Sequence, residues 1–259
     1  MRIFIMHYSP LIDRKLNIEN LLDELEIEGE FITEFDKEVL NKSDKKLQQN
    51  ILLWKKELNL IKSIMIRNII ETNRNSSIAF KLYWQYIKFF QNIITPKSFM
   101  PRELSLSEKS LTLKHHLALE KIYESKEPGL IIEDDIILKP ESKQLIEDSY
   151  FLCKKNFDFI DLGGGCDLPI FKEDKKINEN DRFINLKIPR SRTTAAYMIS
   201  SDCAKVLSNG LLPLTMPIDW KYQFLFVKNN LKVAWSYPSA FVHGSESIFK
   251  TSIDKFSNV

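Results

Sequence analysis

Three consecutive carboxylates, Glu133, Asp134 and Asp135, interrupt an apolar run over residues 130–138. An unpaired carboxylate inside a buried strand takes up a proton or destabilises the fold, so the strand is expected to end at Glu133 and to open onto a cleft. A hard divalent cation in that cleft would compensate the charges, because such metals favour oxygen ligands. The alternative is that Glu133 and Asp134 cap the next segment or pair with Lys139.

Two residues far from this triplet suit the same chemistry, namely His243, after a late predicted strand, and the isolated Asp219. Metal-dependent transfer from a nucleoside-diphosphate donor requires such a set: paired carboxylates at the end of a central strand, a distant histidine and a further aspartate. The metal in such a reaction neutralises the leaving diphosphate.

The elements that would position these residues alternate as in an α/β fold. Ser105 and Glu108 form a capping pair, which predicts a helix directly before the acidic strand. No GxGxxG motif is present, which disfavours a dinucleotide site. Besides the acidic strand, predicted strands cover residues 2–6, 30–35, 157–162 and 195–199, with a last one leading to 241–244, and predicted helices cover 16–27, 105–123, 142–154 and 202–207.

Between about residues 42 and 100 the apolar residues recur at helical intervals, which predicts a helical insertion. Residues 51–97 carry eight basic side chains against two acidic ones. A basic amphipathic stretch with aromatic residues can lie on an anionic membrane surface. Packing of the same helices on the core of the domain is the favoured alternative.

Composition narrows the class of protein. The 259 residues and 44% hydrophobic content suit a single globular domain over 1–259, and the balance of 37 basic against 35 acidic side chains does not indicate a dedicated nucleic-acid binder. Cys153, Cys166 and Cys203 lack CxxC spacing, so neither a disulfide framework nor a zinc site is expected. The cysteines and the lack of a long apolar run predict a cytoplasmic protein, soluble or peripheral to the membrane.

Four groups of residues make the chain resemble glycosyltransferase family 25, which contains lipooligosaccharide galactosyltransferases and their collagen-modifying relatives. They cover both ends and the centre of the chain, whereas the insertion lies outside them. Lys114-His115 stands where the family usually has Ser-His. The groups are Arg14-Lys15 after the first strand, Glu108 with His115 before the acidic strand, residues 192–200 with Ala204, and residues 217–220.

The resemblance implies a GT-A fold, a Rossmann-like mixed sheet flanked by helices, with a nucleotide-binding first half and an acceptor-binding second half. It further implies an inverting enzyme that moves a hexose, galactose by resemblance, from a UDP-sugar to a lipopolysaccharide, lipooligosaccharide or other surface glycan. The expected cofactor is Mn²⁺ or Mg²⁺. The expected place of action is the inner face of the cytoplasmic membrane.

Donor and metal residues follow from the same resemblance. Glu133 or Asp134 would face the ribose or the donor sugar, and Asp135 would ligate the metal that bridges the diphosphate. His243 would complete the metal shell, with Gly244 letting the backbone approach the phosphates. A hydrogen-bonded structural histidine is the alternative for His243.

Other donor contacts are expected after the first strand and before the strand over 195–199. Tyr8 would stack on uracil and Arg14 would contact phosphate, with a surface ion pair as the alternative for Arg14. Arg192 and Thr193 would hold the diphosphate or the donor sugar, with ordinary strand-edge residues as the alternative.

Asp219 is the predicted catalytic base, because an inverting transfer needs one carboxylate within reach of the acceptor hydroxyl. Its alternative is a helix N-cap. The ring of Trp220 is suited to stack on an acceptor sugar, and Asp161 is predicted as an acceptor contact or as a fallback base.

Two other functional classes stay open at the level of sequence. The same carboxylates would suit a metal-dependent nucleotidyl or phosphoryl transferase, which needs no sugar acceptor. The basic aromatic insertion would suit a non-catalytic protein that binds glycans or a membrane surface.

Overall fold

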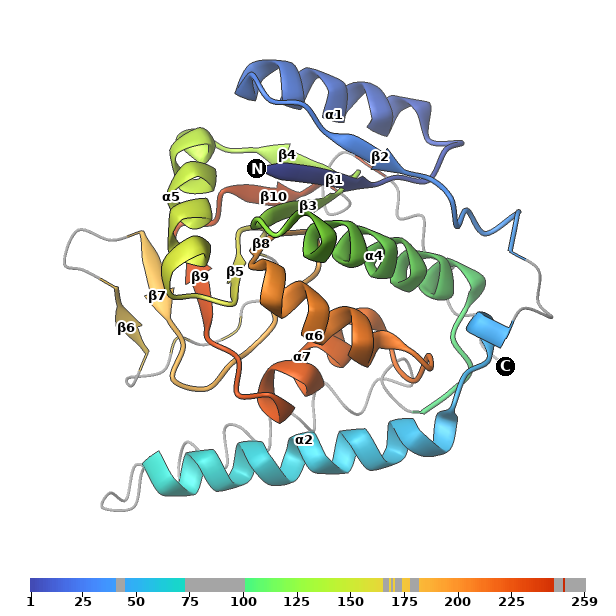
Figure 1. Ribbon diagram of the computed structural model, residues 1–259, viewed down its shortest axis with the longest axis vertical. Helices are drawn as coiled ribbons and strands as arrows, with labels where there is room; N and C mark the ends of the chain where they lie inside the picture. Colours follow the sequence, from blue (N-terminus) through green and yellow to red (C-terminus); the bar gives the residue numbers. More distant parts are fainter. Residues whose placement is uncertain are drawn as a thin grey trace.

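The computed structural model describes residues 1–40, 45–72, 101–164, 168, 170, 174–177, 182–244 and 249, without the side chains of 62 and 64–72. Its centre is an eight-stranded mixed sheet in the order β2-β1-β3-β8-β5-β9-β7-β6 (Figure 1). The strands are β1 Arg2–Met6, β2 Glu30–Ile32, β3 Gly129–Glu133, β4 Ile136–Leu138, β5 Phe159–Asp161, β6 Lys175–Lys176, β7 Phe183–Asn185, β8 Ala196–Ile199, β9 Val233–Ser236 and β10 Phe241–His243. The helices are α1 Ile12–Leu25, α2 Ile51–Thr72, α4 Leu106–Ser125, α5 Ser142–Lys155, α6 Ser201–Leu211 and α7 Ile218–Lys228, with a 3₁₀ turn at Lys45–Leu47.

Helices cover both faces of the sheet because side chains alternate along each strand. In β3, Leu130 and Ile132 join the hydrophobic core under α1 and α5, whereas Ile131 joins the core under α4, α6 and α7. Burial on both faces explains why the central strands read as continuous apolar runs. The predicted fold class, a mixed sheet flanked by helices, is confirmed.

The direction of β8 decides which residues meet at one edge of the sheet. β1 and β3 run parallel, with Met6 opposite Glu133, while β8 runs antiparallel between β3 and β5. The ends of β1 and β3 and the beginning of β8 therefore lie together. The predicted strand end at Glu133 and the capping box of Ser105 and Glu108 are both confirmed.

A two-stranded ribbon extends from this edge. Residues after the acidic triplet form β4, which pairs antiparallel with β10, so that His243 lies opposite Ile136. The backbone N–H of Gly244 donates to the carbonyl of Asp135. The sequence analysis did not identify this pairing, which brings the end of the chain's last described strand to the triplet.

Part of the predicted insertion is described, and it forms α2, whereas residues 73–100 lie outside the described residues. Helix α2 packs against α7, which carries Asp219. Between the two helices, the Glu57 carboxylate accepts hydrogen bonds from the Lys221 ammonium at 2.6 Å and the Thr215 hydroxyl at 2.7 Å, and all three residues are buried. The described part of the insertion is thus tied to the domain core.

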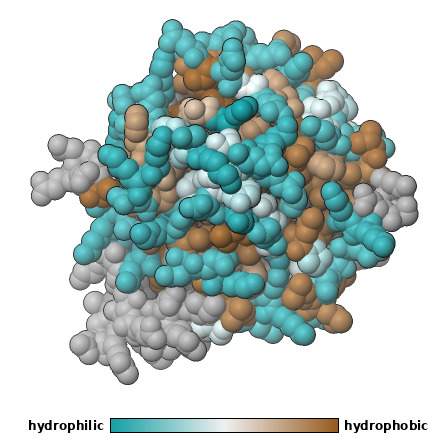
Figure 2. All heavy atoms as spheres, in the orientation of Figure 1, coloured by the Kyte–Doolittle hydropathy of each residue, from teal (hydrophilic) through white to brown (hydrophobic). Residues whose placement is uncertain are grey.

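No helix within the described ranges combines the length and apolar character needed to cross a bilayer. On the face shown in Figure 2, hydrophilic residues predominate and hydrophobic ones are scattered among them. Cys153 and Cys203 are buried and free, and Cys166 lies outside the described residues.

Candidate active site

A pocket of about 210 Å³ lies at the sheet edge where β1 and β3 end and β8 begins. Its wall also includes residues of α4, α7 and β10. Eight of the residues that the sequence singled out line it, namely Tyr8, Arg14, Glu133, Asp134, Asp135, Thr193, Asp219 and His243.

Three of these side chains form a cluster suited to a metal ion. One potential ligand atom from each of Glu133, Asp135 and His243 lies within 4.8 Å of the other two. His243 Nδ1 is 3.5 Å from Asp135 Oδ2. The pairing of β4 with β10 positions the imidazole, since it holds His243 beside the strand that follows the triplet.

The electrostatics of Asp135 suit a residue that binds a cation. Burial, and next the charge of Glu133, raise the pKa of Asp135 to about 6, against the opposing effects of His243 and Arg14. Its Oδ1 is buried and has no hydrogen-bond partner among the described residues. A buried oxygen without a partner costs free energy, and a metal ion at this position would remove that cost. The cluster therefore fits a divalent cation.

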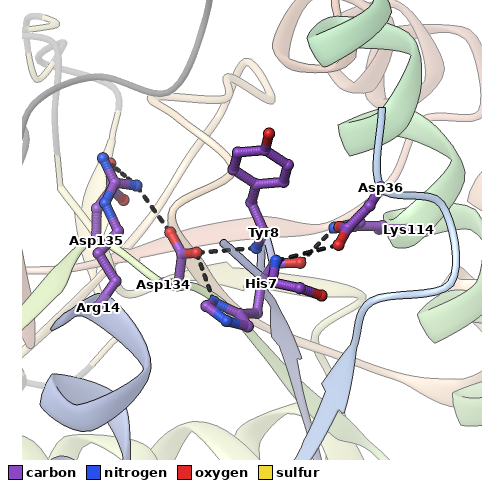
Figure 3. A network of polar contacts seen from close by, with 8 residues as sticks. His7, Tyr8, Arg14, Asp36, Lys114, Asp134 and Asp135 are labelled. Atoms are coloured by element: carbon purple, nitrogen blue, oxygen red, sulfur yellow. Dashed lines mark hydrogen bonds and ion pairs between the residues drawn. The ribbon is translucent and has the colours of Figure 1, made fainter. Parts of the chain in front are cut away.

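Asp134 has a different environment from its neighbours (Figure 3). Its Oδ1 accepts a hydrogen bond from Arg14 Nη1 at 2.8 Å, and its Oδ2 lies 2.8 Å from His7 Nδ1 and accepts from the Tyr8 backbone N–H at 3.1 Å. Although burial opposes it, these bonds lower the pKa of Asp134. The carboxylate that was expected to contact the donor is thus engaged within the protein, where it fixes the end of β1 and the buried Arg14.

Arg14 does not form the surface ion pair that was the alternative for it. Its side chain is buried, and Nη1 also lies 3.5 Å from Asp135 Oδ2. Lys139, which was the alternative partner for the triplet, donates instead to the Ser239 hydroxyl at 2.8 Å.

The sequence analysis missed a buried lysine at the pocket wall. The Lys114 ammonium donates to the carbonyl of His7 and to the carboxylate of Asp36, which connects α4 with β1 and the segment after β2 (Figure 3). Ser107, Ser110 and Lys114 all line the pocket. Their spacing of three and four residues places them on one face of the helix, and this polar stripe was the signal in the sequence.

His115 orients Glu133 from the core side. It is fully buried, its Nδ1 lies 2.8 Å from the Tyr197 hydroxyl, and its Nε2 lies 3.7 Å from Glu133 Oε1. Thr194 donates to the same Glu133 oxygen at 2.7 Å. Burial would raise the pKa of Glu133, but the contacts with His115 and Thr194 and the charge of His243 lower it. Glu133 therefore remains an anion beside Asp135.

Asp219 lies in the first turn of α7, where Pro217 is the N-cap, so the N-cap alternative does not apply. Burial, and next the charge of Glu133, raise the pKa of Asp219 to about 6, while hydrogen bonds from Thr194 lower it. Its Oδ1 is buried without a hydrogen-bond partner in the described part of the chain. A carboxylate with this pKa at a pocket wall is suited to accept a proton near neutral pH.

The model of one protein family matches residues 1–222, and it is described as glycosyltransferase family 25 (LPS biosynthesis protein). The chain belongs to glycosyltransferase family 25. The family 25 chain is accordingly a glycosyltransferase, which favours this class over a nucleotidyl transferase or a non-catalytic binding protein. The match includes the acidic triplet and Asp219, whereas His243 lies beyond it.

Two solved structures show a distant likeness to the family 25 chain. One is a glycosyltransferase involved in the glycosylation of the major capsid of PBCV-1, with 10% identity over 94% of each chain and a TM-score of 0.38. The other is A197 from STIV, with 12% identity over 51% of this chain and 64% of that chain, and a TM-score of 0.31. A search of curated protein sequences finds no match.

Three predicted residues of the family 25 enzyme lie outside the pocket wall. Arg192 lines a neighbouring cavity. Asp161 is fully buried, and its oxygens accept hydrogen bonds from Arg192 and from the Gly164 backbone, so the expected direct contact with an acceptor is at odds with the structure. Trp220 is half-buried, packs against the hydrophobic cluster that contains Trp54 and does not line the pocket.

Proposed function

We propose that this family 25 glycosyltransferase is a metal-dependent, inverting enzyme. It transfers a hexose, galactose by resemblance to the family, from a UDP-sugar to a lipopolysaccharide, lipooligosaccharide or other surface glycan. The observation that carries the proposal is the cluster of Glu133, Asp135 and His243, which shares one pocket with Asp219.

The donor occupies the pocket between the end of β1 and the acidic triplet. Glu133, Asp135 and His243 would hold Mn²⁺ or Mg²⁺, and the bound metal would offset the negative charge of the diphosphate. The ring of Tyr8, which also faces the Lys37 ammonium at 5.2 Å, stacks on the uracil. Asp134 acts indirectly by fixing Arg14.

Arg14 and Thr193 line the same pocket and support the donor from two sides. Arg14 presents its guanidinium, a planar group with five N–H donors, to the diphosphate, and Thr193 contacts the donor sugar. Both assignments rest on position in the pocket together with residue type.

Asp219 is the base in a single displacement. The acceptor oxygen forms a bond to the anomeric carbon while the bond from that carbon to the diphosphate oxygen breaks. The proton of the acceptor hydroxyl passes to the Asp219 carboxylate, and UDP leaves with the electron pair of the broken bond. Attack on the side opposite the leaving group inverts the anomeric centre, so one base is sufficient.

The membrane is where a lipid-linked acceptor is met, and we place the enzyme at its cytoplasmic face. Support comes from the basic composition of residues 51–97. Sedimentation with vesicles tests this location. Binding to vesicles that contain anionic lipid, but not to neutral vesicles, supports it, and equal partition with both contradicts it.

Calorimetry tests the donor site. UDP is titrated into the wild type with Mn²⁺ and with EDTA, into Asp135→Asn with Mn²⁺, and into the control variant Glu24→Gln, whose side chain is exposed on α1. Metal-dependent binding to the wild type and to the control, but not to Asp135→Asn, is expected. UDP binding that is indifferent to Mn²⁺ would sink the proposal.

A further inference from the structure

A second cavity, of about 540 Å³, adjoins the active-site pocket. His243 lines both cavities, so the two meet at the metal cluster. The polar part of the wall of the second cavity includes Lys139, Arg192, Tyr237 and Ser239. No Asp or Glu is among the described residues that line this cavity. We refer to this cavity as the basic groove.

Arg192 is held rigidly in the wall of the basic groove. Its side chain is only 9% exposed, and Nη2 donates to the carboxylate of Asp161 at 2.7 Å and to the Asp161 carbonyl at 3.1 Å. The indole ring of Trp235 lies 4.8 Å from Cζ. These contacts fix the plane of the guanidinium.

The guanidinium keeps donors available for a ligand. Both hydrogen bonds described for the Arg192 side chain come from Nη2, and Nε is buried without a partner in the described part of the chain. An arginine has five N–H donors in a planar fork, which matches a carboxylate or a phosphate. Asp161 therefore orients Arg192 without using all of its donors.

Lys139 adds a second cation to the same wall. Its ammonium donates to the Ser239 hydroxyl, and within the described ranges no carboxylate lies at ion-pair distance from it. Gly164 allows the close approach of Ser239, because a Cβ at Gly164 would lie 2.9 Å from the Ser239 hydroxyl oxygen and the residue has φ +67°. The local backbone is thus shaped around this polar pair.

An aromatic platform completes the basic groove. Tyr237 is 58% exposed although it is a large aromatic side chain. Exposed tyrosine rings can stack on the apolar face of a sugar ring while the hydroxyl remains in water. Two cations, a hydroxyl and an aromatic ring are the groups that recognise a charged saccharide.

The geometry points to the basic groove as the acceptor site, and to an acceptor saccharide that carries a carboxylate or phosphate group. The inference rests on the proposed function, because the groove meets the donor pocket where the sugar is transferred. The anionic group binds Arg192 and Lys139, a sugar ring stacks on Tyr237, and the reacting hydroxyl extends past His243 toward Asp219.

The test compares three saccharides built on lactose: lactose itself, sialyllactose, which adds a sialic acid residue with its carboxylate, and lactose 6′-phosphate. Each is titrated by calorimetry into the full chain saturated with UDP and Mn²⁺. At least one anionic ligand is expected to bind about tenfold or more tightly than lactose, because charge-assisted hydrogen bonds are strong. Whichever anion binds more tightly identifies the carboxylate or the phosphate as the natural group.

Variants locate the preference. Arg192→Gln and Lys139→Gln are each expected to reduce the preference for the anion at least threefold, and the control Lys155→Gln, an exposed cation on α5, is expected to retain it. Arg192→Lys keeps the charge but loses the fork, so an intermediate preference is expected. Thermal unfolding shows whether each variant is folded. If Arg192→Gln does not fold, Lys139→Gln carries the test, because the side chain of Lys139 is partly exposed.

Two results would overturn the inference. One is equal affinity of the wild type for all three saccharides, or no binding of any of them. The other is a preference for the anionic saccharide over lactose that survives in both Arg192→Gln and Lys139→Gln. This includes the case in which Arg192→Gln weakens only the binding of UDP. The metal-dependent titration of UDP is run on the same samples, so an intact UDP site with no anion preference refutes the acceptor site alone.

Discussion

Replacement of Asp135 by asparagine should stabilise the metal-free protein while it abolishes the response to metal. The pKa of this carboxyl is raised from 3.8 to about 6, chiefly by burial and by Glu133. At about 1.4 kcal/mol per pKa unit, the ionised group opposes folding by about 3 kcal/mol at neutral pH. For a chain of this size, that corresponds to an increase in Tm of roughly 6–12 °C for Asp135→Asn in EDTA.

Binding of metal should stabilise the folded wild type by a comparable free energy. A ligand at one hundred times its Kd stabilises the folded state by about 2.7 kcal/mol. Wild type with Mn²⁺ and Asp135→Asn in EDTA should therefore unfold at similar temperatures, both above wild type in EDTA. Asp135→Asn should not respond to Mn²⁺, because it lacks one of the three ligand groups.

The pH dependence has a definite sign. A carboxyl with a raised pKa favours the folded state while it is protonated, and this contribution is lost as the pH rises from 3.8 to about 6. In EDTA, the difference in Tm between Asp135→Asn and wild type should grow between pH 4 and 6 and then level off. Both proteins contain Asp219, so its titration contributes equally to both Tm values and cancels in their difference.

Differential scanning calorimetry at pH 4.5, 6 and 7.5, with EDTA or Mn²⁺, measures all of these quantities. Glu24→Gln should follow the wild type throughout, because its side chain is exposed. A lower Tm of Asp135→Asn than of wild type in EDTA would refute the repulsion argument. An undiminished Mn²⁺ effect on the variant would show that Asp135 is not a ligand.

Three further predictions concern residues around the site. Asp219→Asn should lower kcat by about 10²–10⁴-fold and retain UDP binding, as measured by UDP release and by calorimetry. The wild-type rate should fall as the pH drops below about 6, because Asp219 then takes up a proton. Equal rates for both proteins would exclude Asp219 as the base. Glu57→Ala should cost about 3–5 kcal/mol in urea unfolding, because it leaves the buried Lys221 ammonium unpaired, and a loss below 1 kcal/mol would contradict this. Asp161→Ala should cost a similar 3–5 kcal/mol of folding free energy and weaken anion binding, because the guanidinium of Arg192 loses the carboxylate that orients it. Unchanged anion binding would show that Asp161 does not position Arg192 for the anion.

The elements that were predictable from the sequence depend on local signals. The end of β3 at Glu133 follows from the cost of burying carboxylates, and the start of α4 follows from the capping box at Ser105. Asp135, Asp219 and His243, which the sequence analysis grouped as one chemical set, line one pocket, although Asp219 reaches it from α7 and His243 from the β4–β10 ribbon.

What the sequence did not reveal depends on pairing between distant strands. Asp134 is engaged within the protein, where a donor contact was expected, because its carboxylate is surrounded by donors from the segment after β1 and from α1, and no local pattern encodes these contacts. Asp161 was misplaced for the same reason, because Arg192, which pairs with its carboxylate, comes from the segment before β8 and lies far away in the sequence.

The antiparallel insertion of β8 between β3 and β5 has a consequence for altering substrate choice. The four residues before this strand form a partition, with Thr193 and Thr194 on the side of the donor pocket and Arg192 on the side of the basic groove. A substitution in the partition will disturb both substrates at once. Lys139 and Tyr237 line the basic groove and do not line the donor pocket, so libraries that diversify these two positions offer the route to new acceptors with the donor preference left intact.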